Sequence, residues 1–162
     1  MTLVAPDGTK IGSRYFEVLD SNGNAIILKD GVINKEVFDL RLDTAFVSFD
    51  FQGQGVSTYL LARIFELTPE VKRVESNLIM DNLKAFQDGL PKRELPWDFT
   101  EDSLYDVYSR VEIDEAIANT PFYKTIKKFH FNRVVDFNTS VHLNASTNKP
   151  EWEYLWLGLE IN

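Results

Sequence analysis

The sequence predicts one α+β (or α/β) domain, in which a run of strands precedes a region that mixes helices and strands. Three observations favour this class. Short stretches rich in β-forming residues fill the first third of the chain, a helical period of apolar residues follows, and two long strand-like stretches come last. The chain has 162 residues, 44% of them hydrophobic and 13% aromatic, which is enough for one domain with a packed core.

The first third of the chain is predicted to form a meander of four strands separated by turn residues. The predicted strands are Tyr15–Asp20, Ala25–Lys29, Glu36–Leu42 and Thr44–Phe51. Alternation along the last strand divides its residues into two sets, with Phe46, Ser48 and Asp50 on one side and Val47, Phe49 and Phe51 on the other.

The period then becomes helical. We expect a helix over Gly55–Leu67, a strand over Val71–Met80, a short helix over Asp81–Leu90 and a loop over Pro91–Phe99. Thr100 is predicted to cap a helix, because Glu101 and Asp102 favour the positive end of the helix dipole. The side chains expected to be buried on that helix are Leu104, Val107, Tyr108 and Val111.

A second start signal, Thr120 followed by Pro121, predicts an N-cap and a proline in the first helical position. The apolar face of this helix would hold Phe122, Ile126 and Phe129, and its solvent face Lys124, Lys127 and Lys128. Two long strands are expected last, Arg133–Leu143 and Glu151–Ile161. The final strand is apolar on both faces, which predicts a central, covered strand with Trp152, Tyr154 and Trp156 on one face.

Composition excludes several classes of function. The formal net charge is −8, and such an acidic domain lacks the basic face that general nucleic-acid binding needs. There is no cysteine, and the two histidines are far apart, so we expect neither disulfides nor a metal site. Since the first residues show no signal peptide and no stretch is long and apolar enough to span a membrane, we expect a cytoplasmic protein.

The most informative segment runs from Phe51 to Thr58, where a predicted strand enters a glycine loop that opens a helix. Gly53 and Gly55 leave the backbone accessible, and the first amides of the helix point where its dipole favours negative charge. A pyrophosphate would fit such a site. The alternative is a tight strand-to-helix turn that binds nothing, since short glycine motifs are weak signals.

This segment resembles the acyl-CoA-binding motif of GNAT-superfamily N-acyltransferases, Gln/Arg-x-x-Gly-x-Gly/Ala, and reads Gln52-x-x-Gly55-x-Ser57 here. Ser57 departs from the small residue of the pattern. The resemblance implies a mixed, mostly antiparallel central sheet of about seven strands flanked by helices, with residues 81–118 as a helical insertion. It also implies that acetyl-CoA or another acyl-CoA is bound by Val47, Phe49, Phe51, Gln52, Gly53, Gln54, Gly55, Val56, Ser57 and Thr58.

A second stretch, residues 119–131, is similar to the late helix of the same family, Asn-x-x-Ala-x-x-x-Tyr-x-x-x-Gly-Phe. Asn119 and Phe131 match, whereas Ile126 stands where the pattern has the Tyr that commonly acts as general acid, and His130 replaces Gly. A competing match begins at Asn82. The resemblance implies Asn119 and Lys124 as further cofactor-binding residues, and Tyr123, Glu75 and Asp50 as the candidate acid and bases.

The predicted function is therefore an acyl-CoA-dependent N-acyltransferase that acts on an amine of an unidentified small molecule or protein. A second hypothesis is a non-catalytic acidic module, such as an inhibitor or immunity protein, which binds a basic protein partner. The missing Tyr and the net charge of −8 favour this alternative, and the glycine loop favours the enzyme. A third hypothesis is an effector or toxin domain.

Overall fold

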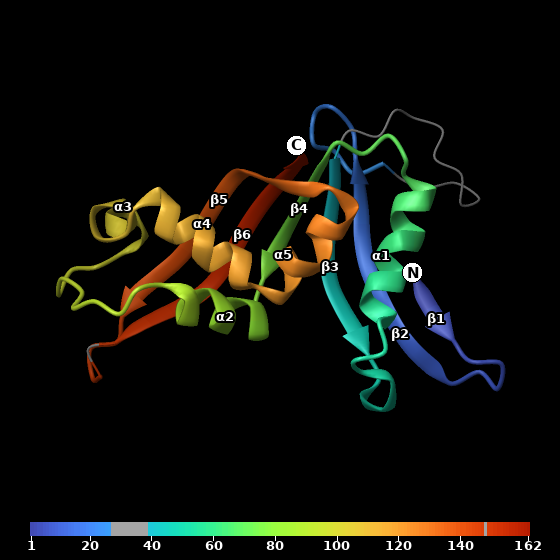
Figure 1. Ribbon diagram of the computed structural model, residues 1–162, viewed down its shortest axis with the longest axis horizontal. Helices are drawn as coiled ribbons and strands as arrows, with labels where there is room; N and C mark the ends of the chain where they lie inside the picture. Colours follow the sequence, from blue (N-terminus) through green and yellow to red (C-terminus); the bar gives the residue numbers. More distant parts are fainter. Residues whose placement is uncertain (27–38, 148) are drawn as a thin grey trace. The chain divides into compact units, whose positions relative to one another are not determined.

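The computed structural model describes residues 1–26, 39–147 and 149–162 (Figure 1). These residues form two compact units, one made of Met1–Ser76 with Ile161 and the other of Asn77–Glu160 with Asn162. The predicted class is confirmed: the chain is α+β, with mixed, mostly antiparallel β-structure and several helices. The described residues contain six strands. The predicted strand Ala25–Lys29 lies largely outside the described residues, which resume at Asp39.

The first unit holds β1, β2, β3 and all but the last two residues of β4, in that order. Their bounds are Thr2–Val4 for β1, Lys10–Leu19 for β2, Asp39–Val47 for β3 and Arg73–Leu78 for β4. β1 with β2 and β2 with β3 pair antiparallel, whereas β3 and β4 pair in parallel across the helical crossover α1, Val56–Leu67. Figure 1 shows α1 lying across β2 and β3, and it contacts both strands.

The core of the first unit lies between α1 and these strands. Leu60, Leu61 and Ile64 of α1 are buried at the spacing of a helical face. The strands contribute their own fully buried side chains, chief among them Val18, Leu40, Leu42 and Val74. The predicted helix over Gly55–Leu67 is thus confirmed to within one residue.

Two strand predictions in this unit need correction. The strand expected at Tyr15–Asp20 begins earlier, at Lys10, and ends at Leu19, with Gly12 inside it. The predicted strands Glu36–Leu42 and Thr44–Phe51 are, in the described residues, one continuous strand that ends at Val47. The break expected at residues 43–44 is a register shift instead, since Leu42 pairs with Phe16 and Ala45 with Arg14.

The second unit combines a helical region with two long strands. Its helices are α2 (Asp81–Gly89), α3 (Leu104–Val107), α4 (Arg110–Asn119) and α5 (Pro121–Ile126), with short 3-10 turns at Glu101–Ser103 and Lys127–Phe129. The strands are β5 (Phe131–Leu143) and β6 (Pro150–Ile161), and β6 lies between β5 and the last residues of β4. The connection from β5 to β6 is short enough to require antiparallel strands.

Helical structure over residues 81–118 is confirmed, but its division differs from the prediction. The helix expected to run from Thr100 through Val111 is two helices, because Ser109 and Glu112 form a capping box that starts α4 afresh. Val111 therefore lies in the new first turn, where its side chain is 65% exposed rather than buried. The start at Thr120 is confirmed, since its hydroxyl accepts from the Tyr123 amide at 3.2 Å and Pro121 occupies the first position.

The aromatic residues of β6 do not share one face as predicted. Trp152 packs edge-on against Phe86, with ring centroids 5.4 Å apart. Tyr154 and Trp156 instead line a separate concavity and are only half-buried, so the covering of both faces expected for this strand is incomplete. The strict alternation of side chains between the two faces of the strand therefore fails between Trp152 and Tyr154. Leu155, the next residue, is fully buried.

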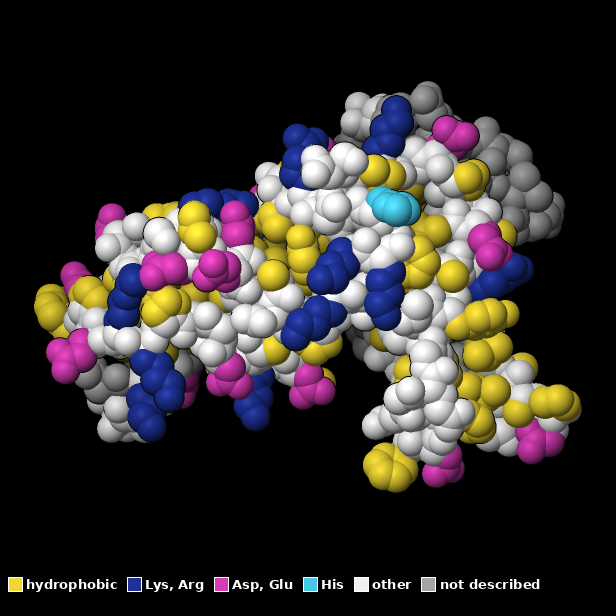
Figure 2. Space-filling model, viewed as in Figure 1, with side chains coloured by type: hydrophobic (Ala, Val, Ile, Leu, Met, Phe, Trp, Pro, Cys, Tyr) yellow, Lys and Arg dark blue, Asp and Glu magenta, His cyan; other side chains and the backbone are white. Residues whose placement is uncertain are grey.

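Charge on the surface is mixed in sign. On the face that Figure 2 shows, the basic and acidic side chains are interspersed over the helices of the second unit. Among the described residues, no helix has the length and apolar composition that crossing a membrane would require.

Candidate anion-binding site

The glycine loop follows β3 and leads directly into α1. A single 3-10 turn, Phe49–Phe51, separates the strand from the loop, and the amides of Phe51 and Gln52 donate to the carbonyls of Ser48 and Phe49. Gly53 has φ of 75° and Gly55 has φ of 80°, the left-handed region in which glycine is least strained. A Cβ built on either glycine would meet no atom within 4 Å, so it is the backbone conformation that requires glycine here.

Gly55 is the N-cap of α1, and the helix presents its first turn without a side-chain cap. The Tyr59 amide is the first to bond back along the helix, to the Gly55 carbonyl at 2.9 Å. The amides of Val56, Ser57 and Thr58 precede it and have no acceptor within the helix. The first turn carries no acidic residue, so these amides and the helix dipole together favour an anion.

Gly12 of β2 allows the first turn of α1 to approach the sheet closely. A Cβ on Gly12 would lie 2.9 Å from the carbonyl oxygen of Phe46 and 2.9 Å from Cγ1 of Val56. Val56 is the first residue of α1, so any side chain at position 12 would displace the helix start. The position of the candidate anion site therefore depends on a glycine in a neighbouring strand.

The parallel pairing of β3 with β4 is short. It covers Asp39–Leu42 and Arg73–Ser76, whereas β3 runs on to Val47. At the last paired position the Ser76 hydroxyl donates to the Leu42 carbonyl at 2.7 Å. A side-chain hydroxyl thus occupies a backbone acceptor where the ladder ends. The pairing stops five residues before the end of β3.

The predicted acyl-CoA residues of this segment are brought together because they are contiguous. Val47 ends β3, Phe49 and Phe51 lie in the 3-10 turn, residues 52–55 form the exposed loop, and residues 56–58 form the first turn of α1. Several backbone groups here already have partners. The Ser48 amide donates to the carbonyl of Ile11 in β2, and the side-chain amide of Gln54 donates to the Asp50 carbonyl at 2.9 Å. Phe49 and Phe51 are not in a strand, so the predicted division into two strand faces is wrong beyond Val47.

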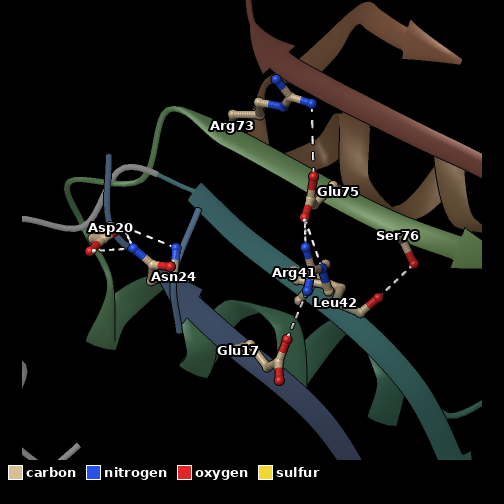
Figure 3. A network of polar contacts seen from close by, with 8 residues as sticks. All are labelled: Glu17, Asp20, Asn24, Arg41, Leu42, Arg73, Glu75 and Ser76. Carbon is tan, nitrogen blue, oxygen red and sulfur yellow. Dashed lines mark hydrogen bonds and ion pairs between the residues drawn. The ribbon is translucent and has the colours of Figure 1, made fainter. Parts of the chain in front are cut away.

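Glu75, one of the candidate bases, is held in an ion-pair network across three strands (Figure 3). Its carboxylate accepts from Arg41 of β3 at 2.8 Å, and Arg41 also contacts Glu17 of β2 at 3.1 Å. Arg73 lies 3.8 Å from the same carboxylate. Partial burial opposes the charge on Arg41, but the hydrogen bonds and attraction from both glutamates raise its pKa above the ordinary value.

The other two catalytic candidates have different surroundings. Asp50 is exposed in the 3-10 turn of the first unit. Tyr123 belongs to the second unit, where it is half-buried on α5, and its hydroxyl donates to the carbonyl of Asn132 at 2.8 Å. That bond ties α5 to the start of β5, so the Tyr123 phenol has a structural partner.

The late-helix residues are also placed by the structure. Asn119 ends α4, its side chain lying beside Gly89 of α2, and Lys124 is exposed on α5. Asn82, the start of the competing match, accepts from the Phe122 amide at 2.7 Å and so caps the first turn of α5. His130, which replaces the glycine of the family pattern, has φ of 71°, a value that glycine adopts more easily.

The sequence did not reveal Gly12, Arg41 or Ser76 as parts of this region. A glycine inside a strand is a usable signal of close backbone approach, and Gly12 could have been noticed on that ground. The pairing of Arg41 with Glu75 spans 34 residues of sequence and had no local signal. In the part of the chain that the structure describes, no three side chains of His, Cys, Asp or Glu gather in a way that could hold a metal ion.

No protein-family model matches the chain, and no curated protein matches it in sequence. Among solved structures, it is similar to the crystal structure of a proposed phosphinothricin N-acetyltransferase, with 12% sequence identity and a TM-score of 0.48. That match covers 98% of this chain and 68% of the other. A similarity of this size does not establish a family.

Proposed function

We propose that this chain is an acyl-CoA-dependent N-acyltransferase of the GNAT type, which moves an acyl group from acetyl-CoA or a related acyl-CoA to an amine. One observation carries the proposal. The Gln52-x-x-Gly55-x-Ser57 segment forms a loop with two glycines at positive φ that ends in the uncapped first turn of α1. The free amides and the dipole at such a helix start favour the binding of a pyrophosphate group.

In this proposal the backbone amides of Val56, Ser57 and Thr58 bind the pyrophosphate. The amine nitrogen attacks the thioester carbonyl and gives a proton to a base, the C–N bond forms, the C–S bond breaks, and the sulfur takes a proton from an acid and leaves as a thiol. Tyr123 is the proposed donor of that proton, and it must give up its bond to Asn132 to act. Asp50 is preferred over Glu75 as the candidate base that accepts the proton of the amine, because Asp50 is exposed whereas Glu75 is engaged by Arg41.

Calorimetry with acetyl-CoA tests the loop directly. Gly55→Glu adds bulk and a negative charge at the helix start, and it should abolish binding. Gly23→Glu is the matched control, because Gly23 has φ of 77° and open space around its Cβ position but lies in another turn. Both variants carry a similar backbone strain of about 1–2 kcal/mol. Unchanged acetyl-CoA affinity in a folded Gly55→Glu protein would overturn the proposed site.

A second function remains supported by a different observation. Glu75 and Tyr123 are both engaged in structural contacts, as a non-catalytic chain would have them. The hypothesis of an acidic binding module predicts that the wild-type chain binds no acyl-CoA. It also predicts a complex with a basic protein that weakens steeply as salt is raised. Acyl-CoA binding by the wild type would contradict the first of these expectations.

A further inference from the structure

The second unit contains a concavity on its strands that the proposed acyl transfer does not use. Its volume is about 380 Å³, and it is lined by five side chains from three neighbouring strands. These are Asn77 of β4, Asp136 and Asn138 of β5, and Tyr154 and Trp156 of β6. We call this set the strand-face pocket.

The five side chains share the face of the strands that is turned away from α2. Phe137, between Asp136 and Asn138, faces the helices, with its ring centroid 6.0 Å from that of Phe86 in α2. Leu155, between Tyr154 and Trp156, is fully buried. Because successive strand residues point to opposite faces, their neighbours point to the other, more open face. Asp136 and Asn138 are accordingly exposed, and the two aromatic residues are half-buried.

The chemistry of the strand-face pocket favours a cation. Asp136 is the only residue of a charged type among the five. The faces of Tyr154 and Trp156 carry the negative quadrupole that attracts ammonium groups. The side-chain oxygens of Asn77 and Asn138 can accept N–H donors, and a carboxylate has about four acceptor positions, so Asp136 can bind a ligand and keep its protein contacts.

From this combination we infer that the strand-face pocket binds a small organic ammonium ion, primary or secondary, with the charged nitrogen at Asp136 and an apolar or aromatic body against Tyr154 and Trp156. The volume lies within the range of small-molecule sites, about 300–1,000 Å³. Primary and secondary amines are favoured over quaternary ones because only they offer N–H groups to the asparagine oxygens. The inference does not rest on acyl transfer, although such amines would be the first acceptors to assay.

Titration of the intact chain with benzylammonium, without acyl-CoA, tests the inference by calorimetry or by NMR. Neutral benzyl alcohol should bind at least about tenfold more weakly, since a cation–π and carboxylate interaction of about 1.4 kcal/mol corresponds to that factor. The affinity for benzyltrimethylammonium should lie between those for benzylammonium and benzyl alcohol. Equal affinity for the amine and the alcohol, or no binding of benzylammonium at about 10 mM, would overturn the proposal.

Two variants locate the binding. Asp136→Asn keeps the shape of the side chain and should weaken benzylammonium binding about tenfold or more. Asp88→Asn makes the same change of net charge at an exposed position of α2 and should leave the affinity unchanged. Equal effects of the two variants would assign the binding to net charge rather than to this pocket. Failure here leaves the acetyl-CoA titration unaffected, so the two proposals can fail separately.

Discussion

Glu75→Gln distinguishes a structural from a catalytic role for Glu75, a buried carboxylate of the first unit. The Glu75 side chain is 9% exposed and accepts from two nitrogens of Arg41, each at 2.8 Å. Glu17 contacts the same guanidinium at 3.1 Å from the other side, but its side chain is 53% exposed. The two glutamates share Arg41 but differ in burial, and Glu75 also lies 3.8 Å from Arg73, so Glu17→Gln controls for the loss of a contact with Arg41 (Figure 3).

The difference in burial sets how much each substitution should lower the free energy of unfolding. A hydrogen bond to a charged group contributes about 1.5–3 kcal/mol net, and breaking a fully buried pair costs about 3–5 kcal/mol. Arg41 is 40% exposed and can be solvated after the change, which places Glu75→Gln at about 1–3 kcal/mol. Glu17→Gln removes an exposed pair and should cost about 0–1 kcal/mol.

Urea denaturation at neutral pH measures both free energies of unfolding. Added salt should reduce the small Glu17→Gln effect and leave most of the Glu75→Gln effect, because buried charges are screened less. Combined with Arg41→Met, Glu75→Gln should be strongly non-additive. A Glu75→Gln protein that is as stable as wild type would refute the structural role of this carboxylate and return it to the list of candidate bases.

Three further predictions concern close packing at Gly12, backbone strain at His130 and the pH dependence of the Glu112 cap. Gly12→Ala should destabilise the fold by about 1–3 kcal/mol through overpacking, and Val56→Ala in the same chain should recover part of that loss in urea denaturation; additive effects would argue against the contact. His130→Gly should stabilise by up to about 1 kcal/mol by relieving φ of 71°, read as a higher melting temperature; no gain would mean that the imidazole makes compensating contacts. The Ser109 amide lowers the pKa of Glu112, so its stabilisation is present above the unfolded-state pKa and is lost as pH falls through the folded-state pKa. The difference between wild type and Glu112→Gln should therefore shrink in acid, and a constant difference would exclude this linkage.

The elements with strong local signals were predicted well from the sequence. The apolar stripe of α1, the Thr120-Pro121 start of α5 and the loop over residues 91–99 all have the expected positions. In each case the signal is short-range, since capping, helical period and proline act within a few residues. The helix assigned to residues 100–111 failed because the Ser109–Glu112 capping box was not recognised as a second start.

The strand errors have a different physical origin. The break expected at residues 43–44 is absorbed as a register shift against β2, which only the partner strand could reveal. The change of face between Trp152 and Tyr154 likewise depends on Phe86, which packs against Trp152 from another part of the chain. The alternation of side chains along one strand, read from its sequence alone, does not show which residues of other segments will pack against it.

For the candidate site, too, features that depend on neighbouring residues could be predicted from the sequence, and features that depend on distant residues could not. The glycine loop and its entry into α1 could be predicted, because the loop conformation depends on its own residues and on the helix that follows, whereas its role as an anion site stays a prediction. The roles of Glu75 and Tyr123 could not, because each is decided by a partner elsewhere: Arg41 on the neighbouring strand and the carbonyl of Asn132. A carboxylate or phenol that already holds a structural partner must break that interaction before it can move a proton. The first measurement of activity should therefore be made on variants that keep those partners in place, and Asp50, which is exposed, is the candidate base whose replacement disturbs the fold least.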